Sequence, residues 1–159
     1  MNHSSTRKIT FGGVIAALYV VLTVVANAFG LASGAIQVRI SEALTILPVF
    51  TTAAIPGLTV GCVLANLITG CAPWDVVFGS LATLIGAVGT RMLRKKPLLA
   101  WIPPVIANMA IVPVVLQKVY GVPDAWWYLA LTVGAGEVIS CGILGLLLYH
   151  SVKNIPQLR

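Results

Sequence analysis

Charged residues are scarce in this chain of 159 residues: Asp, Glu, Lys and Arg make up 9%, whereas hydrophobic residues make up 58%. In soluble globular domains about a quarter of the residues are charged. A soluble domain of this size would lack the polar side chains needed to cover its surface. The composition therefore excludes an ordinary soluble fold and predicts an integral membrane protein of one domain.

Catalytic and metal-binding motifs are also missing. The sequence has no GxxxxGK[ST] loop, the phosphate-binding segment of many ATPases, so we expect no ATP hydrolysis by the chain itself. It has no HExxH zinc motif, and neither histidine lies in the middle of an apolar segment. The cysteines lack metal-ligand spacing, so we interpret them as packing residues. We therefore expect no catalysis, no metal and no cofactor bound by this chain. The residues concerned are His3, His150, Cys62, Cys71 and Cys141.

Long apolar segments account for most of the chain, and about 20 such residues cross a bilayer as a helix. The uncharged stretch 43–74 is too long for one crossing, and Pro56-Gly57 is expected to divide it into two helices. The expected fold is an all-α membrane protein, a bundle of six transmembrane helices in a single domain, 1–159. The predicted spans are 9–29, 40–54, 56–71, 74–93, 97–118 and 125–150.

The basic residues predict the orientation of this bundle. With six crossings and a cytoplasmic N-terminus, the basic clusters within 7–8, 91–96 and 153–159 all lie in the cytoplasm. Arg39 and Lys118 remain on the outer side. This distribution follows the positive-inside rule and predicts that both termini are cytoplasmic. Because the clusters alternate with apolar spans and do not follow one polar face, we expect no nucleic-acid partner.

Glu137 is the acid placed deepest in a predicted span, roughly 18 Å from its outer end at 1.5 Å per residue. An ionisable group at that depth is costly and marks a functional candidate. Ser140 lies on the same helical face, and two glycines beside Glu137 allow a ligand or a backbone to approach closely. Glu137 either binds a ligand or is hydrogen-bonded to a neighbouring helix through Asn108 or Asn66.

The other three acids lie near predicted outer helix ends. Glu42 follows Arg39 by three residues, and both the helix dipole and that arginine account for its position. An arginine on the outer side nevertheless suggests a local purpose. Asp75 either caps the fourth helix or faces an outer cavity, with Trp74 as a stacking surface. Asp124 is predicted to cap the sixth helix.

Amide side chains are concentrated toward the outer half of the predicted bundle. Asn27, Asn66 and Gln117 belong to that half, and Asn108 lies near mid-membrane. Hydrogen bonds between helices explain isolated amides, but they do not explain the uneven distribution. We therefore predict an outward-facing binding cavity.

Small residues on the first predicted span allow another helix to approach closely, either within the bundle or from a partner. These residues are Gly12, Gly13, Ala16 and Ala17.

Six segments, spread over nearly the whole chain, resemble signatures of the QueT family. They are IQVRISEALT (36–45), IPGL (55–58), GCVLAN (61–66), WDVVFGSLAT (74–83), PVIAN (104–108) and GEVIS (136–140). The resemblance implies the S-component, or substrate-binding subunit, of an energy-coupling factor (ECF) importer in the bacterial cell membrane.

The resemblance also implies a ligand, partners and a mechanism. The ligand would be a queuosine precursor, a 7-deazaguanine derivative. The partners would be a transmembrane T-component, contacted by the small residues of the first span, and two cytoplasmic ATPases that use ATP and Mg. The S-component would carry its ligand inward by reorienting within the membrane.

The chemistry of such a ligand suggests a role for each polar candidate. A carboxylate accepts both N–H donors of the deazaguanine edge, and Glu137 is the candidate for this clamp. An amide would bind the ring carbonyl, a second acid would bind a cationic aminomethyl group, and an indole would stack on the ring. The candidate amide is Asn108 or Asn66, the candidate second acid is Glu42 or Asp75, and the candidate indole is Trp74 or Trp126. Arg39 and Ser140 are further candidates beside them.

Three other classes of protein are alternatives to this interpretation. A stand-alone secondary transporter of a small heterocycle would need coupling acids but no partner subunits. A membrane enzyme would need acids, histidines or a nucleophile clustered at one interface, and the four dispersed acids do not supply them. A structural scaffold would not require an acid as deep as Glu137.

Overall fold

The computed structural model describes residues 3–31 and 36–155. All secondary structure in these two ranges is helical, which confirms the predicted all-α fold. Six α-helices are joined by two 3-10 helices, η1 and η2, and by one π-helix, η3. In chain order the elements are α1 (His3–Ala28), η1 (Ile40–Val49), α2 (Ala54–Ile68), α3 (Pro73–Met92), η2 (Pro97–Leu99), α4 (Ile102–Lys118), α5 (Trp126–Glu137), η3 (Val138–Leu144) and α6 (Gly145–Val152).

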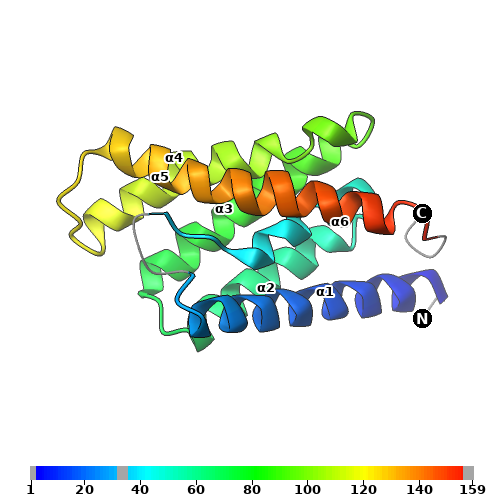
Figure 1. Ribbon diagram of the computed structural model, residues 1–159. Coiled ribbons are helices and arrows are strands. Elements are labelled where there is room, and N and C mark those ends of the chain that lie inside the picture. Colours follow the sequence, from blue (N-terminus) through cyan, green and yellow to red (C-terminus); the bar gives the residue numbers. More distant parts are fainter. Residues whose placement is uncertain (1–2, 32–35, 156–159) are drawn as a thin grey trace.

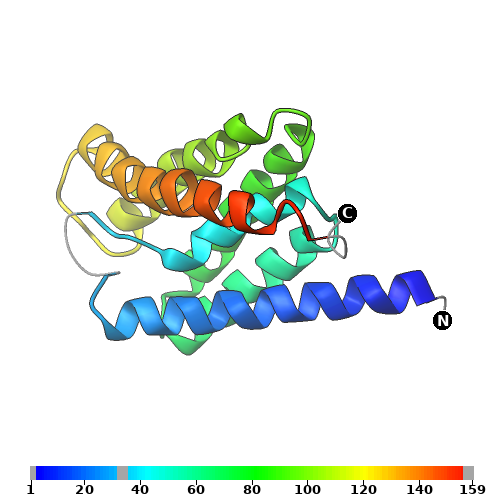
Figure 2. The ribbon, with the colours of Figure 1, turned by 45° about the vertical axis from the view of Figure 1, so that its right-hand side comes forward.

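The helices run up and down along a common axis, so the start of α1 and the end of α6 lie at one end of the bundle (Figures 1 and 2). We refer to this end as the terminal end and to the opposite one as the cavity end. Helix η1 lies inside the bundle between α1 and α6 and also contacts α2 and α3. Eight consecutive residues of η1, from Ser41 to Pro48, are buried.

Among the described residues, four helical segments are long and apolar enough to cross a membrane: Ser5–Ala28, Pro73–Met92, Pro97–Lys118 and Trp126–Val152. The last of these joins α5, η3 and α6 without a break. Helices η1 and α2 are apolar but shorter, with 10 and 15 residues. Their lengths of roughly 20 and 22 Å fall short of a hydrocarbon core about 30 Å thick.

The predicted break between the second and third spans lies elsewhere than expected. The chain turns at Phe50–Ala53, whereas Pro56 falls inside the first turn of α2. A proline is tolerated there because the first backbone N–H groups of a helix have no intrahelical acceptor. The turn is instead held by Arg91, whose Nη1 donates hydrogen bonds to the carbonyls of Pro48 (3.0 Å) and Val49 (3.1 Å). Arg91, which belongs to α3, thereby supplies the hydrogen-bond donor for the last carbonyl groups of η1.

Helices α1 and α2 meet through small residues. A Cβ atom added to Gly57 would lie 2.7 Å from the carbonyl oxygen of Gly12, and one added to Gly61 would lie 3.0 Å from Ala16 Cα. The two backbones therefore touch almost directly. Gly12 and Ala16 serve this internal contact, whereas Gly13 and Ala17 face outward.

The polarity of the bundle is that of a protein in lipid. Large apolar side chains lie on its surface, while hydroxyl, amide and acidic side chains are buried inside it. Examples of the exposed apolar residues are Val14, Val21, Ile85, Ile106 and Leu147.

Candidate functional site

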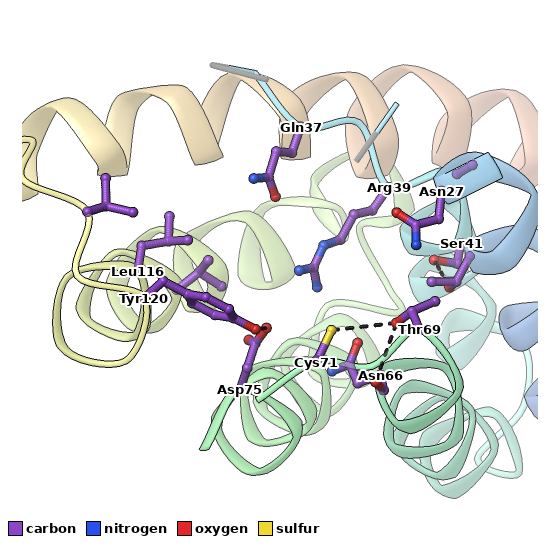
Figure 3. Close-up of a pocket in the computed structure, with 14 residues that line it drawn as sticks. Asn27, Gln37, Arg39, Ser41, Asn66, Thr69, Cys71, Asp75, Leu116 and Tyr120 are labelled. Atoms are coloured by element: carbon purple, nitrogen blue, oxygen red, sulfur yellow. Dashed lines mark hydrogen bonds between the residues drawn. The ribbon is translucent and has the colours of Figure 1, made fainter. Parts of the chain in front are cut away.

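A cavity of about 350 Å³ opens at the cavity end (Figure 3). Its volume falls within the range of small-molecule sites, roughly 300–1,000 Å³. Polar side chains from α1, α2, α3 and the segment before η1 form one part of the wall, and apolar side chains of α4 form another. The lining residues are Thr23, Ala26, Asn27, Gln37, Arg39, Ser41, Asn66, Thr69, Cys71, Asp75, Val112, Leu116, Tyr120 and Val122.

Arg39 supplies a positive charge to this cavity. Its side chain extends from the segment 36–39 into the cavity, toward the wall that carries Cys71 and Asp75 (Figure 3). Within the described ranges its guanidinium donates no hydrogen bond and forms no ion pair. A guanidinium has five N–H donors. The cavity thus offers unused donors to a ligand that carries acceptors.

The segment 36–39 is held in place by the last span. A side chain on Gly136 of α5 would collide with the backbone carbonyl of Gln37, so the absence of a Cβ lets this segment lie directly on α5. Gln37 is also shared with a smaller neighbouring cavity of about 210 Å³. This packing directs Arg39 toward the cavity.

Asp75 supplies the negative charge. Pro73 is the first residue of α3, which places Asp75 in the first turn, where the helix dipole favours an acid. Its Oδ2 accepts a hydrogen bond of 2.9 Å from the Tyr120 hydroxyl, which itself accepts one of 3.1 Å from the backbone N–H of Ala72. Tyr120 thereby links the turn before α3 to the loop after α4. The other carboxylate oxygen, Oδ1, accepts no hydrogen bond within the described ranges.

Burial, together with the neighbouring Asp75 carboxylate, raises the pKa of the Tyr120 hydroxyl above its ordinary value. The hydroxyl therefore stays protonated at neutral pH and remains the donor to Asp75.

Asn66 stands beside Asp75 across the α2–α3 contact. A Cβ atom on Gly79 would lie 3.2 Å from Asn66 Nδ2 and 3.6 Å from Asp75 Oδ1, so this glycine leaves room for both polar groups. Asn66 Nδ2 is also 3.7 Å from the sulfur of Cys62, a weak contact. The amide therefore keeps hydrogen-bonding capacity for a ligand.

The structure brings three of the predicted site residues together on the cavity wall: Arg39, Asn66 and Asp75. Arg39 and Glu42 form no ion pair in the described ranges, so the structure does not support the hypothesis that they pair. Glu42 instead accepts a short hydrogen bond from the Tyr19 hydroxyl.

The remaining predicted residues lie outside this wall. Glu42, Asn108, Glu137 and Ser140 are all buried in the bundle and do not line the cavity. The Ser140 hydroxyl donates to the carbonyl of Gly136, one turn earlier in the helix.

The predicted tryptophans face outward. Trp74 is 61% exposed and stacks on Phe78 on the outer surface of α3, with ring centroids 6.1 Å apart. Trp126 is also exposed. The structure thus provides no indole on the cavity wall. Asp124 does not cap the last span, because the N-cap is Ala125; instead its backbone carbonyl accepts a hydrogen bond from Gln117.

Several cavity residues were not identified from the sequence. From the sequence, Cys71 is interpreted as a packing residue, and Tyr120, Thr23 and Thr69 carry no predicted role. Turn residues and hydroxyls carry no signal of their own, because they become site residues only when separate turns meet at one end of the bundle.

The four long apolar helices and the buried polar groups of the described ranges define a multi-pass membrane protein, and its cavity has the volume of a small-molecule site. The chain belongs to the QueT transporter family, whose model matches residues 9–154. This match confirms the family resemblance seen in the sequence.

A curated relative named "Queuosine precursor transporter QueT", from Lactococcus lactis subsp. cremoris (strain MG1363), is 36% identical over 86 residues. The alignment covers 54% of this chain and 50% of the relative, so the chain matches about half the length of that protein. No solved structure matches the chain.

Proposed function

We propose that this chain is the substrate-binding subunit of an ECF importer and that it binds a queuosine precursor in the cavity lined by Arg39 and Asp75. The observation that carries the proposal is a cavity of about 350 Å³ that presents a guanidinium and a carboxylate oxygen, both without hydrogen-bond partners in the described ranges, beside an amide. The family match and the printed name of the relative support the ligand class.

The polar groups of the cavity complement a 7-deazaguanine. The edge of this ring offers adjacent N–H donors, which a carboxylate accepts with charge-assisted hydrogen bonds. Asp75 is the acid that reaches the cavity. The ring carbonyl is an acceptor, which suits the guanidinium of Arg39 or the amide of Asn66. The apolar wall of α4, including Val112 and Leu116, suits the face of the ring.

This proposal changes the residue assigned to the clamp. The sequence favoured Glu137 for its depth, but Glu137 does not line the cavity, whereas Asp75 does. We therefore assign ligand contact to Asp75 and keep Glu137 as the competing candidate, to be tested beside it.

The partners and the orientation form part of the same proposal. The chain has no phosphate-binding loop of its own, so a T-component and two cytoplasmic ATPases would supply energy from ATP. Arg7, Lys8 and the basic residues of 91–96 gather at the terminal end, which would therefore face the cytoplasm. The cavity would then open to the outside and receive its ligand there, before the subunit reorients in the membrane.

The binding site is tested by titrating the purified chain with 7-aminomethyl-7-deazaguanine. We expect Asp75→Asn to weaken binding by about 1.5–3 kcal/mol, or roughly ten- to a hundredfold in Kd, because a charge-assisted acceptor is replaced by an amide. Asp124→Asn, an exposed acid at the same end, is the control and should bind normally. Normal binding by Asp75→Asn together with loss in Glu137→Gln would return the clamp to Glu137.

Transport is tested in liposomes. Accumulation of the ligand should require co-reconstitution with the T-component and both ATPases, and it should require ATP. If the chain alone accumulates ligand without ATP, it is a stand-alone secondary transporter and the ECF proposal is wrong.

A further inference from the structure

Two acids and a cysteine from distant parts of the sequence meet inside the bundle. One carboxylate oxygen of Glu42, one of Glu137 and the sulfur of Cys141 all lie within 4.8 Å of one another. Glu42 is 1% exposed, Glu137 5% and Cys141 1%. These three residues, which we call the buried triad, are not part of the cavity wall.

The buried triad has unused capacity to bind a cation. Tyr19 donates its hydroxyl to one oxygen of Glu42, and the second oxygen, Oε2, is buried and has no hydrogen-bond partner among the residues that the structure describes. A buried acceptor left without a partner is costly, and a buried carboxylate costs more than a neutral group. A second acid at this distance adds repulsion, so a positive species between the two acids would be strongly stabilised.

The surroundings hold the three donors in position. Cys141 Sγ lies 3.2 Å from Glu137 Oε2 and receives a hydrogen bond of 3.4 Å from the Thr45 hydroxyl. The hydrogen bond from the Tyr19 hydroxyl holds the Glu42 carboxylate. Ligands oriented by such outer hydrogen bonds are typical of protein metal sites. In addition, the π-helix η3 begins directly after Glu137 and contains Cys141, and π-helical turns are frequent at functional sites.

We propose that the buried triad is a metal site for one divalent ion of the Zn²⁺ class. Two carboxylates balance the charge of such an ion, and the thiol favours Zn²⁺, Co²⁺ or Ni²⁺ over Mg²⁺ and Ca²⁺, which prefer oxygen ligands alone. Ligand atoms around tetrahedral zinc lie roughly 3.3–3.8 Å apart, so the three donors need only small movements to close on an ion. From the sequence we expected no metal. Glu42 lies 95 or more positions away from both Glu137 and Cys141, so no spacing in the sequence indicates this site.

The test uses the full chain purified in detergent, without a histidine tag, stripped with a chelator and incubated with ZnCl₂. We expect the metal content after desalting, measured by mass spectrometry of the elements, to approach one Zn²⁺ per chain. Glu137→Gln and Cys141→Ser should lose the metal. The controls Asp75→Asn and Cys71→Ser make the same chemical changes in the cavity and should keep it.

A second measurement starts from the wild-type chain, whose result does not depend on the folding of any variant. Incubated with CoCl₂, the wild-type chain should show the near-ultraviolet charge-transfer absorption of a cobalt–thiolate bond. Cys71→Ser should retain this absorption and Cys141→Ser should lose it. A wild-type chain that binds no Zn²⁺, a cobalt spectrum without the thiolate absorption, or full metal content in Cys141→Ser would each overturn the proposal.

Discussion

The close contact between α1 and α2 predicts a large effect from one added methyl group. In Gly61→Ala the new Cβ would lie 2.8 Å from Tyr19 Cβ and 3.0 Å from both the Cα and the carbonyl oxygen of Ala16. Carbon atoms in packed interiors stay about 3.5–4.0 Å apart. The two backbones must therefore separate by several tenths of an ångström. Overpacking of this kind costs about 1–3 kcal/mol.

Gly13→Ala is the matched control, because a Cβ at that position has no atom within 4 Å. Both substitutions gain about 1 kcal/mol in helix propensity, so the difference between the two variants isolates the packing cost. We expect Gly61→Ala to be less stable than Gly13→Ala by about 1–3 kcal/mol.

Two buried cysteines provide the assay. Cys62 and Cys141 are inaccessible in the folded chain and should react with a fluorescent maleimide only as it unfolds on heating. A Cys71→Ser background removes the partly exposed thiol. The unfolding midpoint of Gly61→Ala should be lower than that of Gly13→Ala. Equal midpoints would refute the conclusion that the two helices are in backbone contact at this position.

Three further outcomes follow from contacts described above. Arg91→Gln should lower the stability by about 1 kcal/mol, because the last carbonyls of η1 lose their donor. Arg94→Gln, at an exposed position, should leave the thermal midpoint unchanged. Tyr120→Phe should raise the Kd for the deazaguanine roughly fivefold in titrations, because Asp75 loses a hydrogen bond worth about 1 kcal/mol; an unchanged Kd would separate Tyr120 from the site. Cys71 should react with a water-soluble thiol reagent in the folded chain, and bound ligand should slow that reaction; equal rates with and without ligand would place the ligand elsewhere.

The helical fold could be predicted because the length and apolarity of the segments report it directly. The internal form of the helices could not. Whether a segment hydrogen-bonds as an α-, 3-10 or π-helix depends on the elements packed against it, and both η1 and η3 contact several neighbouring elements. The turn at 50–53 has the same origin, since Arg91, which holds it, comes from α3.

The cavity itself could be anticipated from the uneven distribution of polar residues, but not its full lining. The sequence gives the depth of a residue in a helix, whereas contact with a cavity also depends on direction. Trp74 and Asp75 are neighbours and point about 100° apart around the helix, so only one of them faces the cavity. Glu137 is buried in the bundle, in keeping with its predicted depth, but its carboxylate lies beside Glu42 of η1 and not on the cavity wall.

The contact between Gly136 and the carbonyl of Gln37 leaves no space for a side chain at position 136. Any side chain at position 136 would lift the segment 36–39 away from the last span and take Arg39 with it, leaving the helices themselves intact. A single substitution there would therefore displace this part of the cavity wall, and in the proposed importer it would hold the chain in its open, ligand-receiving form.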